Sequence, residues 1–408
     1  LLINLRRWIM RLLLSAFAFL SLLGSPVAIQ STKQVVRLGS DLKLPFSPAV
    51  KTGKFIYLSG ALATDENGRF AGGDIKAQTT RILDNLGRVL KTAGSKLENA
   101  VAVSVYLRDI SDFPNMNEVY QGCWPKDPPA RTTVAANLAM PEALIEISMI
   151  AVPDGAERQV ILPDGWVKSP NPYSYGIRSG DTMYLSGLLA RSGKDNSFIA
   201  GDIKVQTKAV MDNAGEILKA GGMTYADVAG TRIYITDTAT FQDMNAAYRT
   251  YFPKDPPARA TVKTGLMSPQ AVVEISLVAV KGGVREAINP PNPDGSPAQP
   301  NPNLSSAIRV GNHLFLSGTL GNDASNRGDA AAQTRATLSR VGRTLKLAGF
   351  DWTDVVDSTV YITDMKNMNA MNEAYREVFK NDPPARVAAE TGLVSPDALV
   401  EIMFMAVK

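Results

Sequence analysis

A five-residue motif, Asp-Pro-Pro-Ala-Arg, occurs three times in this chain, at residues 127–131, 255–259 and 382–386. Fifteen residues after each arginine, an apolar segment contains a glutamate. The arginines are Arg131, Arg259 and Arg386, the glutamates are Glu146, Glu274 and Glu401, and both sets are spaced by 128 and 127 residues. A repeat of fixed and long spacing indicates a structural unit that recurs, so the sequence predicts three copies of one fold.

The size and composition of the chain fit this division. It has 408 residues, of which 45% are hydrophobic and 20% charged, an ordinary mixture for globular domains. Units of about 125 residues are long enough for each to bury a core of its own.

Charge and rare residues exclude several classes of function. One cysteine, Cys123, and one histidine, His313, cannot supply a Cys/His zinc site or a Ser-His-Asp triad to every repeat, so no metal or cofactor is expected. The formal net charge is +4, and three arginines of that total lie within the first 11 residues, so the remainder is nearly neutral. Nucleic-acid-binding proteins usually carry a basic surface, and therefore no nucleic-acid partner is expected.

The first 28 residues have the pattern of a signal peptide. A basic start is followed by an apolar run at 12–23 and by small residues at 25–28. The apolar run is short for a membrane span. We therefore predict an exported protein, in the bacterial periplasm or secreted, whose leader is cleaved and leaves no stable membrane span. The alternative is an uncleaved membrane anchor.

Each repeat shows the same order of local patterns. A strand pattern ends in Ser-Gly at residues 55–60, 182–187 and 313–318, and a helical pattern follows it. A third strand, a short helix ending in a tyrosine, the arginine strand and the glutamate strand complete the unit; the tyrosines are Tyr120, Tyr248 and Tyr375. The predicted fold is α+β, with β-β-α-β-α-β-β repeats whose helices cover one face of a mixed sheet.

The predicted divisions follow from these patterns. Repeat one covers 35–153, repeat two 160–282 and repeat three 303–408, with a proline-rich linker at 283–302. Many prolines between 289 and 302 indicate a stiff, extended connection.

The arginine and the glutamate are the strongest candidates for chemistry. A guanidinium binds a carboxylate through two parallel hydrogen bonds, and the prolines before it fix its position. A glutamate within a buried strand has a raised pKa and can hold a water and transfer a proton. The alternative for both residues is structural, a buried Arg–Glu ion pair within the sheet.

Serine and asparagine recur at matched positions. Without a histidine to activate it, the serine of the Ser-Gly pair is a poor nucleophile, and a hydrogen-bonding or turn role is favoured. Each asparagine precedes its arginine by fourteen residues and either binds ligand or caps a helix, with capping favoured. These residues are Ser59, Ser186, Ser317, Asn117, Asn245 and Asn372.

Taken together, these motifs resemble the RidA/YjgF family, also known as endoribonuclease L-PSP. The resemblance rests on the Tyr-Leu-Ser-Gly strand, Gln-Thr at the start of the main helix, Asn-x-x-Tyr, Pro-Ala-Arg and the closing Glu-Ile strand, and it spans residues 35–408 three times. It implies a chorismate-mutase-like fold, trimers with sites between subunits, and hydrolysis of 2-imino and 2-enamino acids to 2-oxo acids and ammonia.

The same resemblance implies roles for the repeated residues. The arginine holds the substrate carboxylate, the glutamate positions the attacking water, and the serine, the asparagine and a tyrosine near the start of the repeat shape the pocket. That tyrosine is Tyr173 in repeat two but Phe46 in repeat one and Leu304 in repeat three. We therefore predict that repeat two, with Arg259, Glu274, Tyr173, Ser186 and Asn245, carries the best catalytic set.

Three copies in one chain predict an intrachain pseudo-trimer, monomeric in solution, in which each site combines residues of two repeats. The favoured function is a deaminase acting on small 2-imino or 2-enamino acids. One alternative is a module that binds small carboxylates without turnover. An endoribonuclease is the least favoured function, because the charge is nearly neutral and histidine is scarce.

Overall fold

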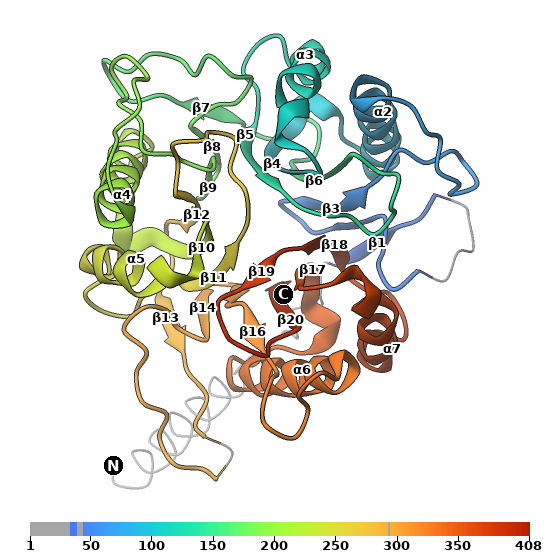
Figure 1. Ribbon diagram of the computed structural model, residues 1–408, viewed down its shortest axis with the longest axis vertical. Coiled ribbons are helices and arrows are strands. Elements are labelled where there is room, and N and C mark those ends of the chain that lie inside the picture. The colour runs from blue at the N-terminus through green and yellow to red at the C-terminus, as the bar shows by residue number, and fades with distance from the viewer. Residues whose placement is uncertain (1–32, 39–43, 293) are drawn as a thin grey trace, which may run out of the picture. The chain divides into compact units, whose positions relative to one another are not determined.

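The computed structural model describes residues 33–38, 44–292 and 294–408, and the predicted signal peptide lies outside them. Residues from 32 onward form one compact unit. Within the described part of the chain, each repeat builds a sheet with two helices (Figure 1). This confirms the predicted α+β class.

The first repeat comprises β1 (Gln34–Val36), β2 (Ala49–Lys51), β3 (Ile56–Ala61), α2 (Ile75–Ala93), β4 (Ala100–Leu107), α3 (Phe113–Cys123), β5 (Ala130–Ala135) and β6 (Ile145–Ala151). The second comprises β7 (Gln159–Ile161), β8 (Gly176–Ser179), β9 (Thr182–Leu185), α4 (Ile203–Ala220), β10 (Val228–Ile235), α5 (Phe241–Tyr248), β11 (Ala258–Lys263) and β12 (Val273–Val280). The third comprises β13 (Arg285–Ile288), β14 (Ala307–Val310), β15 (His313–Leu316), β16 (Thr319–Leu320), α6 (Ala330–Leu347), β17 (Val355–Ile362), α7 (Met368–Val378), β18 (Ala385–Glu390), β19 (Gly392–Leu393) and β20 (Val400–Val407). Short 3-10 helices lie at Leu97–Asn99, Ile110–Asp112, Tyr225–Asp227, Thr238–Thr240, Arg249–Tyr251, Trp352–Asp354 and Met365–Asn367.

The three sheets share one topology. The first has the order β1-β2-β3-β6-β4-β5, in which β4 pairs in parallel with the arginine strand β5 and antiparallel with the glutamate strand β6. The strands β10 and β17 pair in the same two ways in the other sheets. The sheets are therefore mixed, as predicted, and the arginine and glutamate strands lie on either side of one central strand.

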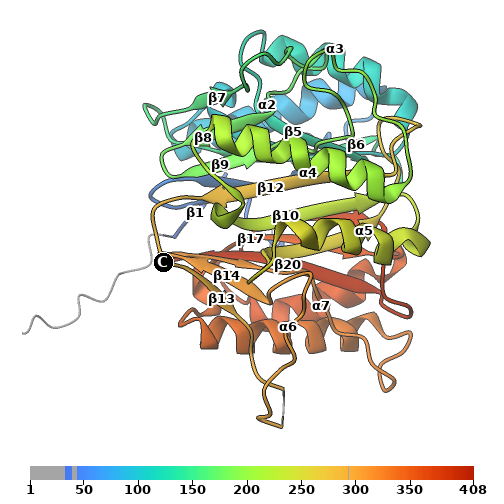
Figure 2. The ribbon, with the colours of Figure 1, turned by 90° about the vertical axis from the view of Figure 1, so that its left-hand side faces the viewer.

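The long helices begin and end at the residues that sequence rules favour. In α2, the Asp74 side chain accepts a hydrogen bond from the backbone N–H of Ala77 at 2.9 Å, and Gly94 ends the helix in the left-handed conformation. The same helix buries Ile82 and Leu86 against its sheet. Figure 2 shows α4 and α5 lying across one face of the strands β10 and β12, so helices cover one side of the sheet.

Three details differ from the prediction. Each sheet begins with an additional short strand, β1, β7 or β13, which pairs antiparallel with the next strand. Strand β13 lies inside the predicted linker at 283–302, because Arg285–Ile288 pairs with β14 instead of remaining a free connection. Helices α3 and α7 continue beyond the tyrosines that were expected to end them.

Residues of all three repeats share two further apolar clusters. One contains the equivalent tyrosines Tyr106, Tyr234 and Tyr361, and the hydroxyls of the last two lie 3.3 Å apart. Strand β19 of the third repeat also pairs with β11 of the second. Contacts of this kind join the repeats through buried surface. Among the described helices, none has the length and apolar character needed to cross a membrane.

Candidate active site

Each arginine enters its sheet from a turn with a fixed conformation. Asp127, Asp255 and Asp382, which open the repeated motif, adopt positive φ angles of 51°, 47° and 47°. Aspartate tolerates this left-handed region better than most residues, and the prolines that follow restrict the backbone further. In the first two copies, an arginine at the start of the next sheet donates a hydrogen bond to the aspartate carbonyl oxygen. Arg158, which directly precedes β7, donates to Asp127 at 2.9 Å, and Arg285 of β13 donates to Asp255 at 2.8 Å. The motif thus places the arginine that follows it.

A serine of another repeat holds the backbone of each arginine. The Arg131 N–H donates to Ser186 Oγ at 2.8 Å, and Ser186 Oγ donates in turn to the Ser174 carbonyl oxygen at 2.7 Å. Arg259 is held in the same way by Ser317, and Arg386 by Ser59, both at 2.8 Å. The hydroxyls of Ser59 and Ser317 likewise donate to backbone carbonyl oxygens. The three serines therefore have the hydrogen-bonding role that the sequence predicts.

The guanidinium groups are buried against aromatic rings and not against carboxylates. Arg131 Cζ lies 4.6 Å from the ring centre of Tyr120, 5.5 Å from that of Phe113 and 6.0 Å from that of Tyr173. Arg259 lies over Tyr248 and Arg386 over Tyr375, at 5.1 and 5.0 Å. Buried N–H groups of Arg259 and Arg386 have no hydrogen-bond partner. Arg131 Nη1 instead donates to the Met116 sulfur at 4.0 Å. A cation that is fixed in this way without a carboxylate partner is suited to a ligand carboxylate.

The glutamates face these arginines across repeat boundaries. Burial raises the pKa of Glu274 to about 8, against the opposing effects of the Thr133 backbone N–H and the charge of Arg131. Glu401 is raised to a pKa of about 8 by burial opposed by Arg259, and Glu146 likewise by burial opposed by Arg386. No nitrogen of these arginines lies within 4.0 Å of a carboxylate oxygen in the described residues. The alternative of a direct buried ion pair is therefore wrong.

A glycine makes room for each glutamate. At Gly187, a Cβ atom would lie 1.9 Å from Glu274 Oε1, and the corresponding distances are 1.8 Å at Gly60 and 1.9 Å at Gly318. Because no side chain fits there, the carboxylate rests directly on the backbone. The glycine of the Ser-Gly pair is thus required by the site, a role that sequence reasoning missed.

The asparagines lie within helices α3, α5 and α7 and not at their ends. The residues at the N-caps are Asp112, Thr240 and Asn367, so the predicted capping role is wrong. The Oδ1 atoms of Asn117, Asn245 and Asn372 are buried without a hydrogen-bond partner. Of the two roles predicted for these residues, ligand binding is the one that the geometry leaves open.

The best-equipped boundary combines residues of repeats one and two. A cavity of about 60 Å³ there is lined by Phe113, Arg131, Thr133, Asn171, Tyr173, Gly187, Leu189, Arg191, Met267 and Glu274. The expected set of repeat two is therefore divided between two boundaries. Tyr173, Ser186 and Glu274 meet Arg131, whereas Arg259 meets Ser317 and Glu401. The sequence order of a repeat does not say which neighbour completes its site.

Arg191 brings a second guanidinium to this cavity. Its Nη1 atom donates to the Asn196 carbonyl oxygen at 3.0 Å, and Cζ lies 5.7 Å from the ring centre of Phe198. The equivalent residues, five positions after the serine, are Thr64 and Asn322. Sequence reasoning missed Arg191, and its lack of an equivalent in the other repeats is the signal that would have found it.

The comparisons with known proteins match this architecture. A family model described as Endoribonuclease L-PSP matches the chain three times, over residues 40–153, 166–281 and 296–408. A RutC family protein of Sulfurisphaera tokodaii is 41% identical over 115 residues, which is 28% of this chain and 92% of that protein. The 3-aminoacrylate deaminase RutC of Acinetobacter baylyi is 39% identical over 108 residues, 26% of this chain and 86% of that protein.

One solved structure is similar over most of the chain. A chorismatase crystal structure aligns with a TM-score of 0.50 and 18% identity, and covers 76% of this chain and 93% of that one. At this identity the likeness concerns the fold alone.

Proposed function

Because the chain belongs to the endoribonuclease L-PSP family, we propose that it hydrolyses reactive 2-imino or 2-enamino acids to 2-oxo acids and ammonia. The observation that carries the proposal is the pairing of Arg131 with Glu274 in one cavity without a direct ion pair. A buried cation that lacks an anion and a buried carboxyl group with a raised pKa together suit an anionic substrate that needs proton transfer. The relative named 3-aminoacrylate deaminase is consistent with this chemistry.

In this proposal the substrate carboxylate binds the Arg131 guanidinium, and the imine carbon faces Glu274. The Glu274 carboxylate accepts a proton from water as the water oxygen adds to the imine carbon. Glu274 gives this proton to the imine nitrogen, which takes the electron pair of the C=N double bond and becomes the amino group of a carbinolamine. Glu274 then transfers the hydroxyl proton to that amino group, the C=O bond forms, the carbon–nitrogen bond breaks, and ammonia leaves with the electron pair of that bond and the 2-oxo acid remains. Burial raises the pKa of Glu274 to about 8, so its carboxylate form is a stronger base than that of an ordinary glutamate and is the minor form at pH 7.

The other two boundaries carry simpler versions of the site. Beside Arg386, Phe46 takes the position that Tyr173 has beside Arg131, and its ring centre lies 5.5 Å from Arg386 Cζ. In repeat three, Leu304 occupies the same position. This loss of the tyrosine hydroxyl favours a second function for those boundaries, the binding of small carboxylates without turnover.

We also propose that one chain acts as an intrachain pseudo-trimer. The hydrogen bonds from Arg131 to Ser186, from Arg259 to Ser317 and from Arg386 to Ser59 support it, since each links a different pair of repeats. A mass in solution near that of one chain, 43.8 kDa for all 408 residues, is the expected result. Three times that mass would contradict it.

Export remains a proposal that rests on residues 1–28. Its test is mass spectrometry of the N-terminus after expression in a bacterium with separation of cell fractions. A chain shortened near residue 28 in the periplasmic or external fraction supports export, and an intact N-terminus in the membrane fraction supports the anchor instead.

The deaminase is tested by measuring ammonia release. An amino-acid oxidase generates 2-iminopropanoate from alanine in the same solution, and purified protein is added. We expect release above the spontaneous rate, and loss of this increase in Glu274→Gln. Glu286→Gln, an exposed change on β13, is the matched control. A wild-type rate equal to the spontaneous rate would refute the deaminase.

A further inference from the structure

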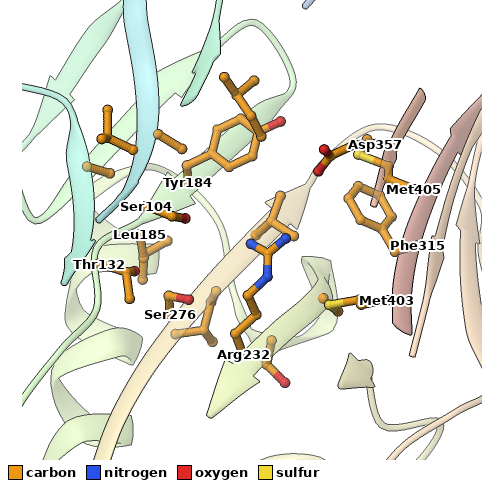
Figure 3. A pocket seen from close by; sticks show the side chains of 18 of the residues that line it. Ser104, Thr132, Tyr184, Leu185, Arg232, Ser276, Phe315, Asp357, Met403 and Met405 are labelled. Atoms are coloured by element: carbon orange, nitrogen blue, oxygen red, sulfur yellow. The ribbon is translucent and has the colours of Figure 1, made fainter. Parts of the chain in front are cut away.

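A second cavity lies between strands of all three repeats (Figure 3). Its volume is about 80 Å³, and it is lined by residues of the central strands β4, β10 and β17 and of their neighbours. The polar side chains that Figure 3 shows around it include Ser104, Thr132, Arg232, Ser276 and Asp357. Arg131 is the one residue that lines both this cavity and the candidate active site, whereas Glu274 lines only the latter.

Two charged residues of this cavity, Arg232 and Asp357, differ from their equivalents in the other repeats. Ala102, Gly230 and Asp357 occupy equivalent positions. Each pairs, in its own sheet, with the alanine that precedes the repeated arginine. The position two residues later holds Ser104, Arg232 and Thr359. One repeat thus supplies a cation and another an anion, at positions where the other copies have small or hydroxyl side chains.

These two charged residues are half-buried, and they do not pair. Within the described residues, no nitrogen of Arg232 lies within 4.0 Å of an Asp357 oxygen. Arg232 Nη2 donates to Thr359 Oγ1 at 3.3 Å, while the buried Nε has no partner. Burial raises the pKa of Asp357 to about 6, against the effects of Arg232 and the Ser358 backbone N–H. Partly buried charges without direct partners are costly, so a group between them is expected to satisfy both.

We propose that this cavity binds a small α-amino acid as its zwitterion. The ligand carboxylate binds Arg232, and the ligand ammonium group binds Asp357. The hydroxyls of Ser104 and Ser276 provide further polar contacts on the wall, and Phe315 and Met405, which lie beside Asp357 in Figure 3, face a small side chain. About 10–15 Å³ of such cavity volume holds one water, so this cavity has room for several waters and suits the smallest amino acids, glycine and alanine.

The chain itself supplies the matched substitutions. Arg232→Ser and Asp357→Ala introduce the residues that stand at these positions in repeat one, Ser104 and Ala102. Glycine and alanine binding is measured by calorimetry on the wild-type chain and on each variant, with acetate and methylammonium as ligands that carry only one of the two charges. Glu274→Gln, which changes a residue that lines only the candidate active site, tests whether binding depends on that site.

The expected result is binding of glycine or alanine that each cavity variant weakens at least about tenfold and that Glu274→Gln leaves unchanged. Acetate and methylammonium should both bind more weakly. Loss of binding in Glu274→Gln but not in Arg232→Ser would overturn the proposal, as would acetate binding as tightly as glycine or no binding at all. If a variant fails to fold, a crystal structure of the wild type with glycine decides: density joining Arg232 to Asp357 supports the site, and separate waters refute it.

Discussion

Replacing Glu274 with glutamine should change how the stability of the protein depends on pH. The folded protein holds this carboxyl group at a pKa of about 8, compared with 4.5 for an ordinary glutamate, because it is buried. Between these two values the folded state keeps a proton that the unfolded state releases. The associated stability is therefore fully present below pH 4.5 and is lost as the pH rises through 8. Glutamine does not ionise, so the Glu274→Gln variant loses no stability at this position as the pH rises from 4.5 through 8.

The size of the effect follows from the shift. Each pKa unit corresponds to about 1.4 kcal/mol, so the full difference is on the order of 5 kcal/mol. Relative to its value at low pH, the free energy of unfolding of Glu274→Gln should therefore exceed that of the wild type by about 3 kcal/mol at pH 7 and by somewhat more at pH 9. Glu146 and Glu401 titrate in both proteins, and the comparison removes their contribution.

Urea unfolding, followed by circular dichroism at about pH 5, 7 and 9, measures this difference. Glu286→Gln, in an exposed position, should follow the wild type at every pH. If the wild type and Glu274→Gln differ by the same free energy at all three values, Glu274 is not held in its protonated form, and the reasoning about its pKa fails.

Three further changes test single contacts of the site. Gly187→Ala places a Cβ atom 1.9 Å from Glu274 Oε1, so the carboxyl group must move and the deamination rate should fall by about 100-fold while the chain still folds; a rate near that of the wild type would contradict the close contact. Arg191→Thr introduces the residue type found at the same position in repeat one, and kcat/KM for a 2-imino acid with a second carboxylate should fall about tenfold more than for 2-iminopropanoate; equal losses would show that Arg191 does not bind substrate. Ser186→Ala removes the 2.8 Å bond from the Arg131 N–H and should lower the free energy of unfolding by about 1 kcal/mol in urea, whereas an unchanged stability would mean that water replaces the hydroxyl.

The fold was largely predictable from the sequence because the same order of strand and helix patterns occurs in all three repeats. The helix α2 begins after Asp74 and ends at Gly94, the residues that capping rules select. Strand β13 was missed because Arg285–Ile288 is short and adjoins a proline-rich segment, and only its pairing with β14 gives it strand structure. Strand pairing between residues that are distant along the chain forms only on folding, so it leaves little pattern in the local sequence.

The candidate site was predictable in its residue types but not in its grouping. The repeated spacing identified Arg131 and Glu274 separately, and the expectation that sites combine two repeats agrees with their positions. The order of the repeats in space cannot be read from the sequence, so the predicted set of repeat two joins Arg259 with Glu274, although Arg259 faces Glu401. The aromatic ring of Tyr120 under Arg131 was also missed, because its contact depends on how α3 packs on the sheet.

The central claim is that a carboxylate-binding arginine and a proton-transferring glutamate meet between repeats one and two. The most direct test compares ammonia release from 2-iminopropanoate by Arg131→Ala, Arg259→Ala and Arg386→Ala under identical conditions. We predict that Arg131→Ala falls to the spontaneous rate, and that Arg259→Ala and Arg386→Ala keep most of the activity. Full activity in Arg131→Ala, or its loss in Arg259→Ala alone, would contradict the account.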